Sequence, residues 1–264
     1  MTAFEDRGDG VTARVEAVDG TAAETLSARY LVAGDGPRSM VRAALGFGYV
    51  GETGVVRDFF GGRMYAIYLR CPYFYARVPH PPAWMNCTFN TNRRAFMTAV
   101  DGREEFAFHT QLRDGEDESA ITDADALRMF QTAVGFPIEC EILSRTGWTA
   151  GHALVADHFQ KGRVFLGGDA VHLFTPAGGL GYNTAIEDAV NLGWKLAAAL
   201  HGEAGPHLLD TYEQERRPVA ERNTGYARQF AESLGLYVAP PEIEEDSPRG
   251  EAARAAAGAY LEAH

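Results

Sequence analysis

Apolar and polar residues alternate along several short stretches of the chain, and this pattern predicts strands before any motif is considered. Residues 11–18 and 25–33 are two such stretches separated by the turn Asp19-Gly20, so we expect a hairpin-like pair. Four later segments are rich in aromatic and β-branched residues: 64–69, 84–89, 95–100 and 105–112. These segments are separated by Pro, Gly and Asn clusters, and they predict an antiparallel sheet.

Other stretches carry apolar residues at three- and four-residue spacing, which is the pattern of helices. We expect helices at residues 39–45, 123–134, 184–200, 208–234 and 252–263. Ser39 is the predicted N-cap of the first helix, and Gly46 follows its end. Thr184 and Glu187 fit a capping box at the start of the third. Pro218 removes one backbone hydrogen bond from the fourth, so we expect a break or a kink there.

Composition and charge narrow the classes of function. The 264 residues, of which 46% are apolar, suffice for one large or two modest domains. A formal charge of −12 argues against nucleic acid and an anionic membrane surface as partners. No apolar stretch has the length of a membrane helix and no signal-peptide pattern is present, so we expect a cytoplasmic protein. The cysteines, Cys71, Cys87 and Cys140, lack metal-site spacing, and we expect free thiols.

A candidate site begins where an apolar strand meets two glycines and an aspartate. The run Val164–Asp169 brings a carboxylate to the carboxyl end of a strand, the edge at which open α/β sheets bind ligands. Pro176–Asn183 then forms a glycine-rich loop that opens into a helix. The free N–H groups and positive dipole of a helix start suit an anion, or a ring that becomes anionic, such as a reduced flavin. His172, between the two segments, is interpreted as stabilising the loop and not as a base.

Taken together, three segments resemble the second flavin-binding motif of the FAD-dependent aromatic-ring hydroxylases related to p-hydroxybenzoate and phenol hydroxylases: Gly167–His172, Pro176–Asn183 and Glu187–Leu196. The similarity continues through Leu209–Arg228. The resemblance implies that Asp169 binds the ribityl chain and that Pro176 lies near the reactive edge of the isoalloxazine. It also implies that the amides of Tyr182 and Asn183 bind the pyrimidine carbonyl.

A second block, Ala28–Arg42, is similar to the Asp-Gly motif of the same family, which contributes to FAD and NAD(P)H binding. Arg38 and Arg42 lie one helical turn apart, where they could stack on or pair with dinucleotide groups. The cofactor-binding residues predicted from both motifs are Asp35, Gly36, Arg38, Gly168, Asp169, Pro176, Gly178, Gly179, Gly181, Tyr182 and Asn183. No metal ligand, nucleophile or base is assigned. Gly46–Gly51 matches G-x-G-x-x-G, but it follows a helix and not a strand, so we reject it as a dinucleotide site.

The resemblance implies a mixed α/β fold. We expect a partial, Rossmann-like FAD-binding domain at residues 1–54 and 150–235, an antiparallel-sheet substrate domain at 55–149, and a C-terminal tail and helix at 236–264. An aromatic substrate pocket is expected to draw on Tyr68, Phe108, His109, Trp148 and Phe174.

The family begins with a βαβ unit whose G-x-G-x-x-G holds the FAD pyrophosphate, and no such unit precedes Asp35. The strands at 30–33 and 164–166 would then lack their usual parallel neighbours, leaving a sheet edge open. We therefore expect an FAD-dependent monooxygenase that uses NAD(P)H and O₂ to hydroxylate a phenolic or polyketide ring. It would be an N-terminally truncated or split chain, with a second chain as a candidate partner that supplies the pyrophosphate site. The alternative is a non-catalytic remnant or interaction domain that does not bind FAD by itself.

Overall fold

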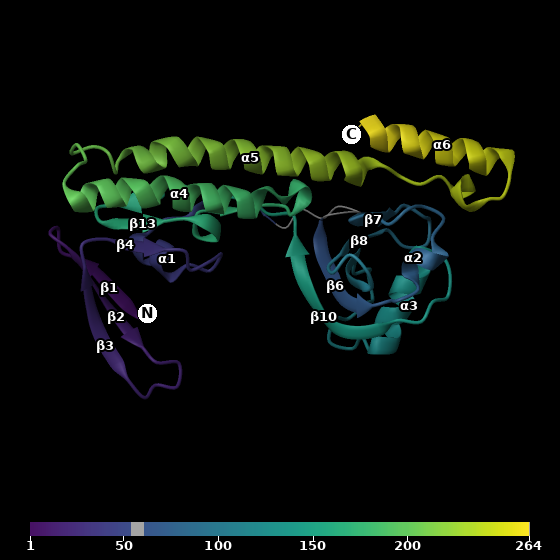
Figure 1. The fold of residues 1–264 in the computed structure, drawn as a ribbon, viewed down its shortest axis with the longest axis horizontal. Coiled ribbons are helices and arrows are strands. Elements are labelled where there is room, and N and C mark those ends of the chain that lie inside the picture. Colours follow the sequence, from purple (N-terminus) through teal and green to yellow (C-terminus); the bar gives the residue numbers. More distant parts are fainter. Residues whose placement is uncertain (54–60, 264) are drawn as a thin grey trace. The chain divides into compact units, whose positions relative to one another are not determined.

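The computed structural model describes residues 1–53 and 61–263, a mixture of helices and strands that divides into two compact units (Figure 1). The first unit contains Met1–Thr53 and His152–Arg228. The second contains the described residues of Gly54–Gly151 and Gln229–His264. The expected start of a substrate domain at residue 55 lies outside the described residues.

Three small sheets form the strand framework of the first unit. The first is antiparallel in the order β1 (Ala3–Asp6), β2 (Val11–Glu16), β3 (Ala23–Ala28). The second has the order β12 (Gln160–Lys161), β13 (Val164–Leu166), β4 (Leu31–Ala33). The third has the order β14 (His172–Leu173), β11 (Ala153–Ala156), β5 (Tyr49–Glu52). The N-terminal hairpin is confirmed, but the prediction of one extended segment at 25–33 is wrong because β3 and β4 belong to different sheets.

Strands β4 and β13 run parallel, with Leu31 opposite Val164 and Ala33 opposite Leu166. They come from segments more than a hundred residues apart, pair through backbone hydrogen bonds, and contribute apolar side chains to the same core. In the sheet order β4 is an edge, and Val32 on it is 51% exposed. The expected open edge therefore lies on β4 in the part of the chain that the structure describes.

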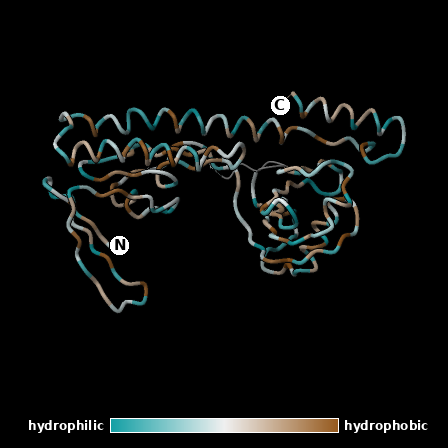
Figure 2. Tube along the Cα trace, viewed as in Figure 1, coloured by the Kyte–Doolittle hydropathy of each residue, from teal (hydrophilic) through white to brown (hydrophobic). Residues whose placement is uncertain are grey.

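Helices cover this framework: α1 (Met40–Leu45), α4 (Leu180–His201) and α5 (Thr211–Leu236). Two short 3₁₀ turns, η1 (Gly168–Ala170) and η2 (Ala177–Gly179), connect β13 to α4. The predicted cap and end of α1 are confirmed, since the Ser39 hydroxyl accepts from the Arg42 amide and Gly46 has a φ of 80°. Figure 2 shows hydrophobic residues recurring along α4 among hydrophilic ones, as the spacing predicts.

Of the two predicted outcomes at Pro218, a break or a kink, the break is wrong. Helix α5 continues through it without a break. Proline removes one N–H from the helix, and tertiary contacts compensate for that loss. Tyr212 and Ala220, on either side of Pro218, are fully buried in the core of the unit, and Arg216 is nearly so.

The second unit is built on one antiparallel sheet, as the sequence predicts. Its order is β10 (Glu141–Ala150), β6 (Gly62–Arg70), β9 (Glu105–Gln111), β8 (Ala95–Ala99), β7 (Met85–Thr88). The helices of this unit are α2 (Phe74–Arg77), α3 (Asp123–Val134), α6 (Pro248–Ala263) and the end of α5 from Gln229, and a 3₁₀ turn η3 (Pro241–Glu244) lies in the expected C-terminal tail. Helix α3 matches its predicted bounds, and Phe130 on its apolar face is fully buried.

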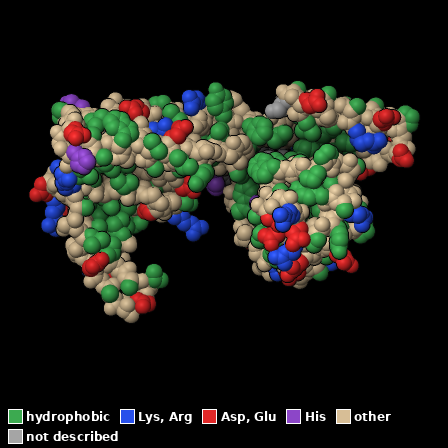
Figure 3. Space-filling view, in the orientation of Figure 1, with side chains coloured by type: hydrophobic (Ala, Val, Ile, Leu, Met, Phe, Trp, Pro, Cys, Tyr) green, Lys and Arg blue, Asp and Glu red, His purple; other side chains and the backbone are tan. Residues whose placement is uncertain are grey.

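Strand alternation gives this sheet two different faces. One face packs with α3 in a core that includes Ile67, Phe106 and Phe108. The opposite face carries His109 and, across β6, Trp148. Acidic and basic side chains also gather on the surface of this unit (Figure 3).

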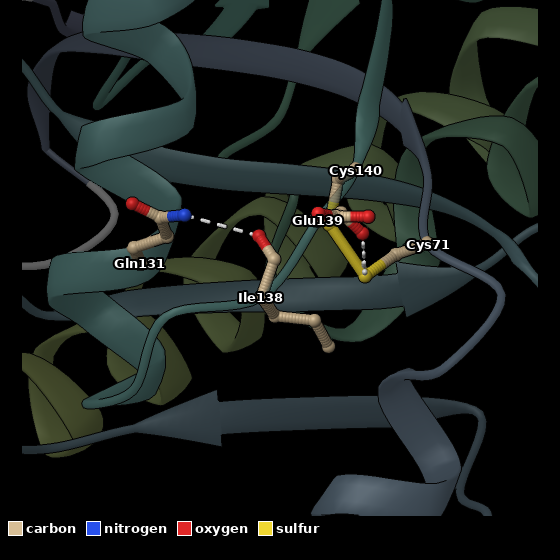
Figure 4. The surroundings of a disulfide bond; sticks show 5 residues. All are labelled: Cys71, Gln131, Ile138, Glu139 and Cys140. Atoms are coloured by element: carbon tan, nitrogen blue, oxygen red, sulfur yellow. Dashed lines mark hydrogen bonds between the residues drawn. A yellow bond between two sulfur atoms is a disulfide. The ribbon is translucent and has the colours of Figure 1, made fainter.

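Cys71 and Cys140 pair as a disulfide in the second unit (Figure 4), so the expectation of three free thiols is wrong for these two. The pairing follows from register: Arg70 lies opposite Glu141 in the ladder, and the cysteines are the next residue beyond on each strand. Their Cα atoms are 4.5 Å apart. Sequence spacing alone did not reveal that β6 and β10 are neighbours.

Among the described residues, no helix is long and apolar enough to cross a membrane.

Candidate flavin site

The centre of the candidate site is the short turn that follows β13. All three residues of β13 are buried, and η1 then turns the chain so that Asp169 is exposed. The Asp169 carboxylate has no hydrogen-bond or ion-pair partner among residues 1–53 and 61–263. Gly168 adopts a φ of 60°, a conformation that favours glycine, which lets the chain reverse here. The structure thus presents an unpaired carboxylate at the carboxyl end of β13, as the sequence predicts.

A buried polar network holds this turn against α4 and α5. Oδ2 of Asp188 accepts the Gly168 amide at 3.2 Å and lies 2.6 Å from Nε2 of His172. The other oxygen of Asp188 accepts from Nε of Arg216 at 2.8 Å. Because a carboxylate only accepts, Nε2 of His172 carries the proton. His172 and Asp188 are at most 1% exposed, so His172 acts in the structure of the loop, as expected, and is not placed to act as a surface base.

The glycine-rich loop leads into α4 earlier than the sequence predicts. Helix α4 begins at Leu180, with Gly179 as N-cap at a φ of 64° and Gly178 before it at 78°. The predicted capping box is wrong: the Thr184 hydroxyl donates to the Leu180 carbonyl from inside the helix. Gly178 and Gly179 have positive φ values that other residues rarely adopt, and they allow the loop to enter the helix without a side-chain cap.

The earlier start changes which amides are free. In a helix that begins at Leu180, Gly181 and Tyr182 lie in the first turn, where amides have no intrahelical acceptor. Asn183 lies one position later, where its backbone amide has the Gly179 carbonyl as its helical acceptor. The side-chain amide of Asn183 donates to the same carbonyl at 2.9 Å. The available donors are therefore those of Gly181 and Tyr182 and not that of Asn183. Gly181 also allows close packing, because a Cβ there would lie 3.3 Å from Phe174.

The Asp-Gly block forms the turn before α1. Asp35 accepts the Val41 amide at 3.2 Å. Partial burial opposes its charge, but hydrogen bonds from the Ser39 hydroxyl and the Val41 amide outweigh that effect and lower the pKa of Asp35. Gly36 has a φ of 81°, and Arg38 is exposed with no partner among the described residues. Asp35 thus shapes the turn, while Arg38 is left available for a ligand.

Arg42 joins the two motifs and is not directed at a dinucleotide. Its guanidinium donates to the Pro37 carbonyl of the first block and to the Ala170 carbonyl of η1, each at 2.9 Å. It also donates to the Tyr49 hydroxyl at 2.8 Å, and that hydroxyl donates to the Asp169 carbonyl. Sequence reasoning missed Tyr49, which lies inside the rejected Gly46–Gly51 match. No sequence signal connects a tyrosine to a turn 120 residues away.

The expected pocket residues are divided between the two units, and those of the second unit lie on both faces of its sheet. Tyr68, His109 and Trp148 lie on one face of the second unit's sheet, whereas Phe108 is 1% exposed in the core on the other face. Phe174 belongs to the first unit, where its ring packs on His172 at 5.0 Å. His109 and Trp148 meet edge to face at 5.7 Å between ring centroids. Burial lowers the pKa of His109 to about 4, so its ring is neutral near pH 7.

A protein-family model described as "FAD binding domain" matches residues 1–227 of the chain. The chain belongs to this FAD-binding family. The match covers the first unit up to residue 227 and the Gly54–Gly151 part of the second unit, and it ends within α5 before Gln229–His264.

Relatives of the chain include proteins that are named as hydroxylases. A putative polyketide hydroxylase of Streptomyces halstedii is 38% identical over 259 residues, which are 95% of this chain and 44% of the relative. The rebeccamycin biosynthetic enzyme RebC with reduced flavin matches with a TM-score of 0.86 and 37% identity, covering 98% of this chain and 48% of RebC. Aklavinone-11 hydroxylase with FAD and aklavinone matches with a TM-score of 0.77 and 30% identity, covering 86% of this chain and 42% of that one. The chain therefore spans less than half the length of each.

The residues present fit the flavin half of FAD. A polyol chain needs acceptors for its hydroxyls, and the unpaired Asp169 carboxylate is one. A ring that gains negative charge needs donors, which the first turn of α4 supplies. A Cβ built on Gly179 would meet nothing within 4 Å, so the loop surface is open to a ligand.

Proposed function

We propose that this chain forms the ribityl and isoalloxazine side of an FAD-dependent monooxygenase that hydroxylates an aromatic polyketide or phenolic ring with NAD(P)H and O₂. The observation that carries the proposal is the unpaired Asp169 carboxylate beside the open glycine loop at the start of α4. The named relatives, a polyketide hydroxylase and an aklavinone hydroxylase, support the substrate class. Because the reaction consumes NAD(P)H, we keep a cytoplasmic location as part of the proposal.

The roles of the chain's own residues follow from their chemistry. Bound flavin would supply the hydride acceptor and the oxygen-transfer chemistry. Asp169 would accept hydrogen bonds from ribityl hydroxyls, and the amides of Gly181 and Tyr182 would donate to a ring carbonyl. The positive end of the α4 dipole would favour negative charge on the ring. Gly36, Gly168 and Gly178 would allow close approach of the backbone, and Pro176 at the loop surface would border the ring.

The aromatic substrate is proposed to lie against the sheet face that carries His109 and Trp148. Nδ1 of His109 and Nε1 of Trp148 are buried without a hydrogen-bond partner among the described residues. Such groups are costly, about 1–3 kcal/mol each, unless something pairs with them. Substrate hydroxyl or carbonyl oxygens would provide the missing partners. Tyr68, on the same face, donates instead to Glu105.

The FAD pyrophosphate site is proposed to come from a strand–helix segment, on the same polypeptide or on a second chain, that packs beside β4 and α4. Strand β4 is a sheet edge in the described part of the chain. Along α4 the exposed apolar side chains recur at four-residue steps: Tyr182, Ile186, Val190 and Trp194, each at least 44% exposed. Parallel strands are normally covered on both faces and paired at both edges, so this surface fits such a segment.

The test compares FAD with riboflavin, which lacks the pyrophosphate and adenosine. We expect the purified chain to bind both with similar dissociation constants, measured by quenching of flavin fluorescence. Fusing an N-terminal βαβ segment with a G-x-G-x-x-G motif should strengthen FAD binding at least tenfold, by about 1.4 kcal/mol or more, and riboflavin binding little. The fused protein should then oxidise NAD(P)H in the presence of a hydroxyanthraquinone.

Two results would contradict the proposal. Binding of FAD much tighter than riboflavin by the unfused chain would place the pyrophosphate site within these residues. No flavin binding by either protein would support the alternative, a non-catalytic interaction domain. An Asp169→Ala variant of the fused protein is the matched control, because it removes the proposed ribityl contact and leaves the pyrophosphate segment intact.

A further inference from the structure

We infer that Tyr49 and Arg42 are positioning residues that fix the backbone of Asp169 and Ala170, and so hold the Asp169 carboxylate where a ribityl chain is bound. This inference rests on the proposed function for the identity of the ligand. We assign neither side chain a direct contact with the flavin. Both act on the turn through its carbonyl groups.

The contacts form a closed chain between the two motifs. The Tyr49 hydroxyl donates to the Asp169 carbonyl, and Nη1 of Arg42 donates to the Tyr49 oxygen at 2.8 Å and to the Ala170 carbonyl at 2.9 Å. Nη2 of Arg42 donates to the Pro37 carbonyl at 2.9 Å. Two consecutive carbonyls of η1 are thus held by Tyr49 and Arg42, while Asp188 holds the Gly168 amide.

The geometry of the pair makes it rigid. The Arg42 guanidinium lies 3.9 Å from the centroid of the Tyr49 ring, so the two side chains are stacked as well as hydrogen-bonded. Tyr49 begins β5, where it lies opposite Ala156 in the ladder with β11. Arg42 is on α1, whose N-cap and C-cap are both satisfied. A side chain from a strand and one from a helix therefore converge on a turn that has only three residues of its own.

The protonation state suits the role of donor. Burial raises the pKa of Tyr49 to about 12, and the nearby carboxylates Asp169 and Asp35 add to this, while Arg42 opposes it. The phenol consequently keeps its proton throughout the physiological range and can donate to the Asp169 carbonyl. Because the backbone carbonyl is the acceptor, the carboxylate of Asp169 stays free for a ligand.

The test uses Tyr49→Phe, which removes the hydroxyl and keeps the ring under Arg42. A net hydrogen bond contributes about 0.5–1.5 kcal/mol, so riboflavin binding should weaken roughly 2- to 12-fold. Lumiflavin, which has no ribityl chain, should bind as tightly as to the wild-type chain. A purely structural defect would weaken both ligands alike. Tyr49→Phe should weaken riboflavin binding less in the Asp169→Ala background than in the wild-type chain, because both residues serve the same contact with the ribityl chain.

Tyr30→Phe is the matched control. Tyr30 also lies in the first unit under an arginine, with Arg163 5.2 Å from its ring centroid, but its hydroxyl has no partner among the described residues. We expect it to change neither ligand's affinity. Equal weakening of riboflavin and lumiflavin by Tyr49→Phe, or no change in either, would overturn the inference.

Amide hydrogen exchange tests the positioning without any flavin. In Tyr49→Phe, peptides that cover residues 168–172 should exchange faster, whereas those in β6 and β9 should not change. If the wild-type chain binds no flavin but this acceleration is seen, the proposed function fails and the positioning role stands. If exchange at 168–172 is unchanged, the positioning role fails whatever the flavin result.

Discussion

At the scale of single residues, the exposed carboxylate of Asp169 and the buried carboxylate of Asp188 have opposite roles. Asp188 accepts hydrogen bonds from Gly168, His172 and Arg216 and is 1% exposed. Its charge is satisfied within the protein, so its role is structural. The Asp169 carboxylate, three residues beyond the end of β13, has no partner in the described part of the chain and is available to a ligand. The sequence distinguished the two only through the motif resemblance.

Removing the Asp169 side chain should weaken flavin binding without unfolding the protein. A hydrogen bond to a charged group contributes about 1.5–3 kcal/mol, so Asp169→Ala should raise the riboflavin dissociation constant roughly 10- to 150-fold. The thermal midpoint without ligand should stay close to the wild-type value because no internal contact is lost. Fluorescence titration and calorimetry measure the two quantities. Asp114→Ala, an exposed acid in the second unit, is the control, and an equal effect there would refute the assignment.

At the scale of elements, α4 and α5 run side by side (Figure 1) and are joined by a buried lysine. Lys195 is fully buried, and its ammonium donates to Thr211 at 2.7 Å and pairs with Glu215 at 2.8 Å. Hydrogen bonds from Lys195, and then from Asn191, lower the pKa of Glu215 to about 2. The helical pattern predicted both helices, but their polar contact depends on their relative rotation, which the pattern does not contain.

The Glu215 contact makes part of the stability dependent on pH. Its pKa is lower in the folded than in the unfolded chain, so its contribution is complete above about pH 4.5 and is lost as the pH falls toward about 2. Glu215→Gln should therefore lower the thermal midpoint at neutral pH by a few degrees, and the difference from wild type should shrink in acid. Glu221→Gln, which removes only a surface pair with Arg217, should show a smaller effect at neutral pH. A pH-independent difference for Glu215→Gln would contradict this account.

At the scale of the whole molecule, the two units have separate cores. One core surrounds β13 and α5, and the other lies between α3 and the five-stranded sheet. The flavin motifs lie in the first unit, and the neutral His109 lies in the second. A ligand that binds only the folded form stabilises the elements it contacts by mass action.

Flavin should therefore protect the two motifs selectively. With FAD present at a large excess over its dissociation constant, amide exchange should slow in peptides covering residues 34–42 and 167–183. The β6–β9 pairing in the second unit should exchange at the same rate with and without FAD. Mass spectrometry of exchanged peptides distinguishes the two regions. Uniform protection, or none at residues 167–183, would count against the proposed site.

The sequence by itself determined β6 to β9 of the second unit, the helix α3, the cap of α1 and the identity of the flavin motifs. These features depend on local periodicity, on glycine and capping chemistry, or on a run of neighbouring residues, and all of that is present in the linear chain. The sequence misplaced the start of α4, and of the break or kink predicted at Pro218 no break occurs, because glycine geometry at Gly179 and burial around Tyr212 outweighed local propensity.

Only the tertiary structure decided the contacts between distant segments. The pairing of β4 with β13, the Cys71–Cys140 disulfide and the contact of Tyr49 with Asp169 depend on which strands are neighbours, and the burial of Asp188 depends on how α4 packs on α5 and η1. Strand register is set by the packing of whole faces and not by the residues of one strand. For this reason Asp169 could be named from the sequence, whereas the residues that hold it in place could not.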